Sequence, residues 1–455
     1  MKIEVVPEAA KAFNEQAEIL LTEFVTAPKK PNNPRNEQPS GPDIYVPITI
    51  SNKDIIGEIQ LAHVDFFGVE IGKSFADGGV QFGLFDEGYK TLVTLADKFQ
   101  NKIKPLRDAV SKERVKDLIF EWCELKYRKQ TDSTMTEFVI EKCEGLIQEL
   151  EIWIPVSMLQ IQSDIVLGKV TFKTATRNLF DTWKTQEISR FPEQEEYIEK
   201  FIGQMREEMQ GYAVATIKLV AEYERASEIA FEEAEKAVSL LRLFSPANFY
   251  PQLISYTALR GKQHHDFYKF FTVQNGMFVG PEEGVLDISA KPWVISNVQI
   301  SEFRKLGIDI LSGLLVKEKL TKFQESLVNA LLLYSRSSIA KELSYKLVYI
   351  LAAIESMFLR DGSEHIQSNI GERMAFLAGS TPKERMEIFR AVKNIYAVRS
   401  DFLHHGKNIS MDDLEKMRIF MMTSWRCLAG LIQLSADDNM TSEKFFKMLE
   451  EKKWS

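Results

Sequence analysis

The chain has 455 residues, of which 45% are hydrophobic, enough apolar side chains for more than one buried core. Its formal net charge of −8 excludes a general attraction to nucleic acid, so any contact with a polyanion has to be local. The three cysteines are widely spaced, and the chain shows neither a signal peptide nor an apolar run of about 20 residues. These features predict a soluble, cytoplasmic protein without disulfides, a zinc site or membrane contact.

Residues 1–42 and 43–210 form the first two predicted regions. An amphipathic helix is expected from Ala9 to Leu21, followed by a linker in which five prolines crowd a polar segment up to residue 42. Residues 43–210 read as an α+β domain. Short runs rich in branched and aromatic residues predict strands near 44–51, 55–64, 66–72 and 151–175, and periodic apolar positions predict helices over 89–129, 134–150 and 195–209.

The remaining two regions are residues 211–300 and 301–455. The former begins with one long strand that leads into a helix rich in Ala, Glu and Leu, followed by loops and short strands. His264, His265 and Asp266 fall among these loops and are interpreted as surface residues. From residue 301 onward the strand signals vanish and six amphipathic segments predict an all-α domain. The predicted fold class is therefore α+β, with a mixed region followed by a helical bundle.

One stretch of the helical domain, from Glu384 to Lys407, stands out. Phe389, Val392, Tyr396, Arg399 and Leu403 follow one another at spacings of three and four, which keeps them on one helix face. Four of the five are apolar, so we expect Arg399 to lie in an apolar seam, where an unpaired guanidinium is costly. His404 follows five residues later, about 140° around an ideal helix. Gly406 favours a helix end there, which would let the imidazole turn toward Arg399.

The segment from Arg390 to Asn408 carries four basic residues against one acid, Asp401, in an otherwise acidic chain. A solvated helix face explains such a pattern. The alternative is a local contact with RNA through Lys393 and Lys407.

The motif Arg399-Ser-Asp-Phe-Leu-His404, near the end of a helix inside an all-α domain, resembles the R-x4-6-H mark of the HEPN superfamily of helical-bundle ribonucleases. The segments ELSYKLVYILAAIESMFL, ERMAFLAG and IYAVRSDFLHHG are similar to the Apea-like branch, in which Tyr-x-x-Arg-Ser is followed by His-Gly. This resemblance covers roughly residues 319–434. Phe402 departs from the family's pattern, which has a small apolar residue at that place.

The resemblance implies an endoribonuclease that needs neither metal nor cofactor, and the residue chemistry agrees with it. Histidine exchanges protons near neutral pH, so His404 is the candidate acid or base for the 2'-hydroxyl of RNA. Arginine matches a phosphate with its planar fork, so Arg399 is the candidate phosphate ligand. Attack by the 2'-hydroxyl leaves a 2',3'-cyclic phosphate and a 5'-hydroxyl.

Five supporting residues are expected around this pair. Asp401 is a candidate partner for His404 or Arg399, and Glu355 is a second candidate partner for Arg399. Ser400 belongs to the matched motif, His405 is placed either in the cleft or on the surface, and Tyr396 either stacks on a base or packs in the bundle.

An arginine in an apolar seam, together with the resemblance, predicts a homodimer whose two Arg/His pairs share one cleft. Because constant ribonuclease activity would be toxic, we expect the N-terminal region to restrain or trigger it, as in proteins of antiphage defence that act as regulated toxins. Three alternatives stay open. The domain is a non-catalytic dimerisation or nucleotide-binding module, or it is a toxin held by a nucleotidyltransferase-type antitoxin. In the plainest alternative, Arg399 bridges Glu355 or Asp401 to fix the bundle.

Overall fold

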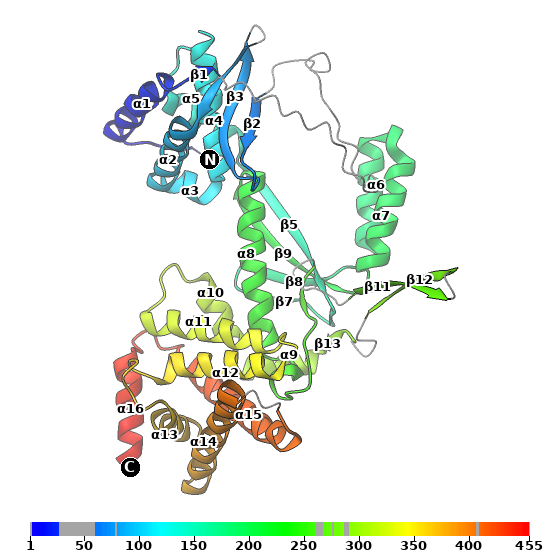
Figure 1. Ribbon diagram of the computed structural model, residues 1–455, viewed down its shortest axis with the longest axis vertical. Coiled ribbons are helices and arrows are strands. Elements are labelled where there is room, and N and C mark those ends of the chain that lie inside the picture. Colours follow the sequence, from blue (N-terminus) through cyan, green and yellow to red (C-terminus); the bar gives the residue numbers. More distant parts are fainter. Residues whose placement is uncertain are drawn as a thin grey trace. The chain divides into compact units, whose positions relative to one another are not determined.

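The structure is a computed structural model that describes residues 2–26, 60–77, 80–260, 267–274, 277–285, 291–405 and 409–454 (Figure 1). For 267–274, 277–285, 403–405 and 454 this description covers the backbone only. The predicted proline-rich linker, the His264, His265 and Asp266 cluster and Lys407 lie outside these residues. The protein is a mixed α+β chain in which strands precede a helical C-terminal region, as its sequence predicts. It divides into two compact units, residues 1–150 with 219–228, and residues 151–218 with 229–455.

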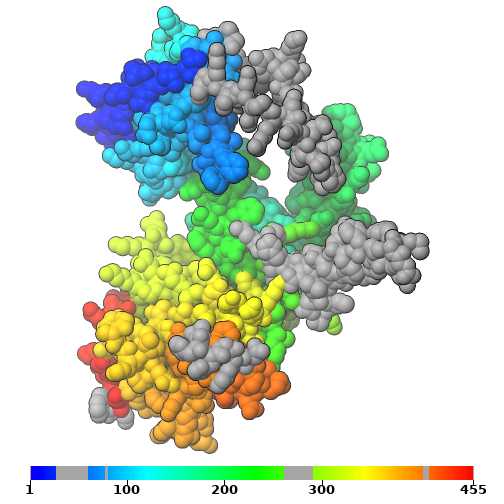
Figure 2. Space-filling model, in the orientation of Figure 1, coloured from blue at the N-terminus to red at the C-terminus, as the bar shows by residue number. Residues whose placement is uncertain are grey.

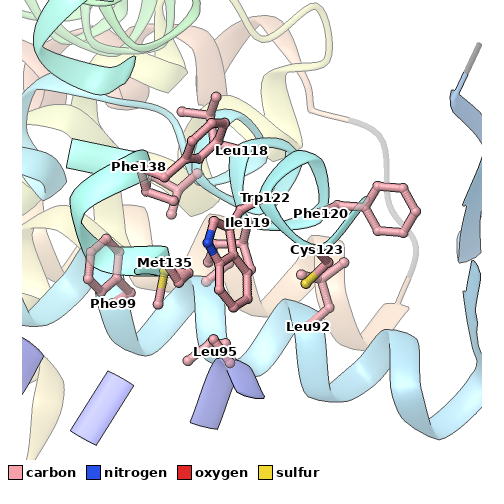
Figure 3. Packing of buried hydrophobic residues seen from close by; sticks show 14 of the residues in the cluster. Leu92, Leu95, Phe99, Leu118, Ile119, Phe120, Trp122, Cys123, Met135 and Phe138 are labelled. Atoms are coloured by element: carbon pink, nitrogen blue, oxygen red, sulfur yellow. The ribbon is translucent and has the colours of Figure 1, made fainter. Parts of the chain in front are cut away.

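The first unit packs helices against a four-stranded antiparallel sheet with strand order β1-β4-β3-β2. Its strands are β1 (Val25–Thr26), β2 (Gln60–Val64), β3 (Glu70–Asp77) and β4 (Val80–Phe85). Its helices are α1 (Pro7–Leu21), α2 (Asp86–Lys102), α3 (Lys104–Ala109), α4 (Lys112–Tyr127) and α5 (Met135–Leu146). The core collects α2 side chains at helical spacing, among them Leu92, Leu95 and Phe99, against Trp122 and Phe138 of α4 and α5 (Figure 3).

The predicted helix over 89–129 is wrong in its continuity, because the structure has three helices there. Pro105 occupies the first turn of α3, where its missing N–H does no harm but a longer helix could not continue. Ser111 then begins α4 by accepting a hydrogen bond from the Arg114 backbone N–H at 3.1 Å. The next predicted helix was also too long, since α5 ends at Leu146 and a strand begins at Gln148.

A five-stranded sheet with order β10-β5-β9-β8-β7 follows along the chain. Its strands are β5 (Gln148–Ser157), β7 (Ile165–Leu167), β8 (Val170–Thr174), β9 (Ala213–Ala221) and β10 (Ala258–Leu259), and the short β6 (Leu159–Ile161) pairs in parallel with β13 (Trp293–Ile295). Between β8 and β9 the chain forms a helical hairpin of α6 (Arg177–Arg190), η1 (Pro192–Gln194) and α7 (Glu195–Met209). A separate hairpin consists of β11 (Phe267–Gln274) and β12 (Met277–Val285).

The second unit also holds the C-terminal part of α8 (Tyr223–Arg242), the turn η2 (Pro246–Asn248) and the predicted all-α region, coloured yellow to red in Figure 2. The helices of this bundle are α9 (Asn297–Lys305), α10 (Ile308–Val316), α11 (Lys322–Ser337), α12 (Leu343–Phe358), α13 (Ile366–Ala378), α14 (Pro382–His405), α15 (Met411–Leu434) and α16 (Ser442–Trp454). Capping boxes begin α9, α11 and α15, at Ser296, Thr321 and Ser410. Among the described helices, none is long and apolar enough to cross a membrane.

Candidate active site

Helix α14 carries the predicted motif, and its buried face differs from the predicted stripe. The buried side chains are Ile388, Ala391, Val392, Ile395 and Val398. Phe389, which the predicted stripe included, is 37% exposed, and the Arg399 side chain is 35% exposed. The buried ridge therefore runs through Ile388 and Ile395, one residue earlier than the predicted one. The expectation of a buried Arg399 is wrong, because this register leaves the arginine at the edge of the helix interface, where water still reaches its guanidinium.

Glu355 of α12 is the partner that the structure assigns to Arg399. Nη1 of Arg399 lies 3.6 Å from Oε1 of Glu355, whose side chain is 23% exposed. This distance is longer than a good hydrogen bond, and a half-exposed ion pair contributes about 0–1 kcal/mol to stability. The pair therefore orients the guanidinium without consuming its five hydrogen-bond donors.

Tyr396 completes this cluster. Its hydroxyl donates to the same oxygen, Oε1 of Glu355, at 2.7 Å. Burial raises the pKa of Tyr396 far above its ordinary value, and the hydrogen bond to Glu355 adds to this effect, so the phenol stays protonated and neutral. The Cζ atom of Arg399 lies 5.9 Å from the centre of the Tyr396 ring, at the outer limit of a cation–π contact. Tyr396 thus packs beside Arg399 and fixes the carboxylate of Glu355, the partner of Arg399.

His404 lies on a different side of the same helix. Because α14 continues through His405, the backbone of His404 is about 140° around the axis from Arg399 and about 7.5 Å further along it. The same helical geometry places His404 about 20° from Lys393 and about 40° from Ser400, both of which are exposed. The predicted residues of α14 therefore fall on two faces. Arg399 and Tyr396 lie on the face that contacts Glu355 of α12, and Lys393, Ser400 and His404 lie on the other. The side chains of His404 and His405 lie outside the described residues.

Asp401 is exposed. The pKa of Lys416 on α15 is raised mainly by the hydrogen bond that Lys416 donates to Asp413, and the carboxylate of Asp401 adds to this effect. The negative charge of Asp401 therefore acts on α15. Among the described residues, no group of three or more His, Cys, Asp or Glu side chains is arranged to hold a metal ion.

No protein family, curated protein or solved structure matches this chain. The case for a function therefore depends on the geometry of this site and on the sequence motif from Arg399 to His404.

Two features of the structure were not predicted from the sequence. The hydrogen bond between Tyr396 and Glu355 joins residues 41 positions apart, although Glu355, as the single carboxylate of α12, indicated a polar partner across the bundle. A cavity lined by α8, α11 and α12, described below, also left no local pattern, because its walls come from helices about 100 residues apart.

Proposed function

We propose that the C-terminal bundle is a metal-independent endoribonuclease of the HEPN class, with Arg399 as phosphate ligand and His404 as acid or base. The observation that supports this best is the position of Arg399. Its guanidinium is half-exposed at a helix edge, held by a weak ion pair to Glu355 whose other contact is Tyr396. A phosphate oxygen could bind the guanidinium beside that ion pair, because the 3.6 Å contact leaves the hydrogen-bond donors of Arg399 available.

The reaction follows from these roles. His404 takes the proton from a ribose 2'-hydroxyl, and the oxygen attacks the adjacent phosphorus. The bond from phosphorus to the 5'-oxygen breaks, and that oxygen receives a proton from a second acid. Arg399 stabilises the charge that grows on the phosphate oxygens in the transition state. The products are a 2',3'-cyclic phosphate and a 5'-hydroxyl.

Two requirements favour a homodimer, namely the need for a second acid and the angle between Arg399 and His404 on α14. On one helix Arg399 and His404 diverge by about 140°, so they do not readily converge on a single phosphate. A two-fold axis beside α14 would bring His404 of one copy to Arg399 of the other and supply two histidines to one RNA strand. In an acidic chain, the basic residues of α14, Arg390 and Lys393 among them, would supply the local attraction to RNA. We assign to the N-terminal unit the role of restraining this activity until a trigger arrives, as in a toxin-like effector of antiphage defence.

A second candidate function is a non-catalytic dimerisation module. The observation that favours it is the ion pair itself, since Arg399 within 4 Å of Glu355 is also what a structural bridge between α12 and α14 would look like.

Purified protein and its variants separate the two functions. Arg399→Ala and His404→Ala are compared with Arg418→Ala, whose half-exposed guanidinium pairs with Glu415 on α15. The ribonuclease proposal expects the parent and Arg418→Ala to cleave single-stranded RNA, while the two site variants lose at least about a hundredfold in rate. Equal cleavage by all four proteins would remove the catalytic assignment. No cleavage by the parent, with dimers lost on Arg399→Ala, would support the module instead.

A further inference from the structure

A cavity of about 860 Å³ lies between α8, α11 and α12 within the second unit. This volume lies within the range of about 300–1,000 Å³ that is typical of small-molecule sites. It involves none of Arg399, Glu355 or Tyr396, so it is independent of the proposed ribonuclease site.

The α8 wall of this cavity contains two charged side chains, Arg242 and Glu235, whose hydrogen bonding is incomplete. Arg242 is 2% exposed, and it donates from Nη1 to the Thr257 carbonyl and from Nη2 to the Ser239 hydroxyl, each at 2.9 Å. Its Nε is buried without a hydrogen-bond partner, and so is Oε2 of Glu235, two turns earlier on the same helix face. An unpaired buried donor or acceptor costs about 1–3 kcal/mol. A fixed donor and a fixed acceptor in one wall are therefore an arrangement that a ligand with both kinds of group would complete.

The pKa of Arg242 is lowered to about 10 by its burial, which Glu235 partly offsets. The guanidinium keeps its positive charge at neutral pH even so. A buried cation with so little compensation favours an anionic or strongly polar neighbour.

Aromatic rings and a second arginine form the remaining walls. Phe231 of α8 and Tyr345 of α12 are 44% and 58% exposed, and Tyr349 lies one turn after Tyr345. Exposed rings lining a cavity offer flat faces on which another ring can stack. Arg336, in the last turn of α11, is exposed beside them. With Lys236, the cavity holds three basic side chains against the carboxylates of Glu232 and Glu235.

We propose that this cavity binds a small anionic ligand with a planar nitrogen-rich ring, the chemistry that nucleotides and pterins share. The ring stacks on Tyr345 and Phe231, its polar edge meets Glu235 and Arg242, and its anionic group meets Arg336. Ligands without a ring fill only the arginine part of the cavity, and uncharged aromatic ligands leave Arg336 unpaired.

Isothermal titration of the full chain with AMP, GMP, folate and inorganic phosphate tests this site. Arg336→Ala and Tyr345→Ala change exposed side chains, so they leave the buried bonds of Arg242 intact. Glu235→Gln tests whether the polar edge of the ligand's ring contacts Glu235. Lys322→Ala is the matched control, because it removes an exposed cation from the opposite end of α11, away from the cavity.

We expect at least one of the three ring compounds to bind at one site per chain, with phosphate alone binding at least about tenfold more weakly. Arg336→Ala and Tyr345→Ala should each weaken that binding at least about tenfold, Glu235→Gln should change the ranking of the ring compounds, and Lys322→Ala should leave affinity unchanged. The proposal is overturned if none of the ring compounds binds, if phosphate binds equally well, or if the cavity variants bind like the control. Because no RNA is present, none of these outcomes depends on the ribonuclease proposal.

Discussion

The hydroxyl of Tyr396 donates a 2.7 Å hydrogen bond to Oε1 of Glu355, the oxygen that also lies 3.6 Å from Nη1 of Arg399. One carboxylate oxygen thus connects a neutral phenol to a half-exposed guanidinium. Glu355 is therefore a positioning residue for Arg399, and its effects should be separable from those of Arg399 itself.

The first prediction concerns this positioning role. Glu355→Gln keeps the size of the side chain but removes its charge, and Tyr396→Phe removes the hydrogen bond to it. We expect each to lower kcat for RNA cleavage by about threefold to tenfold with little change in KM, since an unfixed guanidinium spends less time at the phosphate. The thermal midpoint should fall only slightly, because the bond removed is worth about 1 kcal/mol. Steady-state kinetics that match the parent for both variants would leave Glu355 without this role.

The second prediction tests the shared cleft by mixing inactive variants. If each site takes Arg399 from one copy and His404 from the other, a heterodimer of Arg399→Ala and His404→Ala keeps one such pair and lacks only the second histidine, whose place as acid water has to take. Mixing the two purified variants and allowing subunits to exchange should therefore restore part of the cleavage, at most about a quarter of the parent rate when half the dimers are mixed. A mixture as inactive as its components would place both residues of a site on one chain.

Much of the fold was accessible from sequence, and the reasons are local. The helix α7 was predicted with its bounds, Glu195–Met209, and the capping box that begins α15 involves only residues from Ser410 to Asp413. The strand β9 and the helix α8 after it were also predicted in the right order. In each case the deciding signal lies within a few neighbouring residues.

The site was less accessible, because burial on α14 depends on which neighbours it meets. The apolar residues of this helix support two stripes that share Val392, and only packing in the bundle selects the one through Ile388 and Ile395. Arg399 therefore lies at the edge of the helix interface and not in the predicted apolar seam. Glu355 was one of the two proposed partners of Arg399. This pairing depends on α12 and α14 lying side by side, which no local pattern specifies.

A third prediction concerns the turn between α9 and α10. Gly307 has φ of 104°, a left-handed conformation, and a Cβ there would lie 2.5 Å from Cγ2 of Ile432. Gly307→Ala should therefore lower the free energy of unfolding by about 2 kcal/mol or more. Gly313→Ala is the control, because a Cβ at this helical position of α10 meets nothing within 4 Å and should stabilise the protein by up to about 1 kcal/mol. In denaturant titrations, the unfolding free energies of the two variants should differ from that of the parent in opposite directions. A shift of both in the same direction would contradict the packing at Gly307.

The fourth prediction is a pH dependence set by Lys346. This side chain is 1% exposed, donates to the Leu253 carbonyl at 2.6 Å, and has its pKa lowered to about 8 by burial. Between pH 8 and its ordinary pKa of 10.5 the folded chain has lost this proton while the unfolded chain keeps it, so stability rises with pH. The total rise is about 3 kcal/mol.

Lys346→Met isolates this effect, because all other titrating groups are shared with the parent. The unfolding free energy of the parent should increase relative to the variant from pH 8 to 10.5, and the two should run parallel below pH 8. A constant difference across the whole range would mean that Lys346 stays charged in the folded protein.

Sequencing RNA ends after induced expression of the parent, Arg399→Ala, His404→Ala and Arg418→Ala tests the central claim most directly. The proposed function predicts 2',3'-cyclic phosphate and 5'-hydroxyl ends at defined sites with the parent and with Arg418→Ala, and background levels with the other two. The same ends at the same sites in Arg399→Ala and His404→Ala would contradict it.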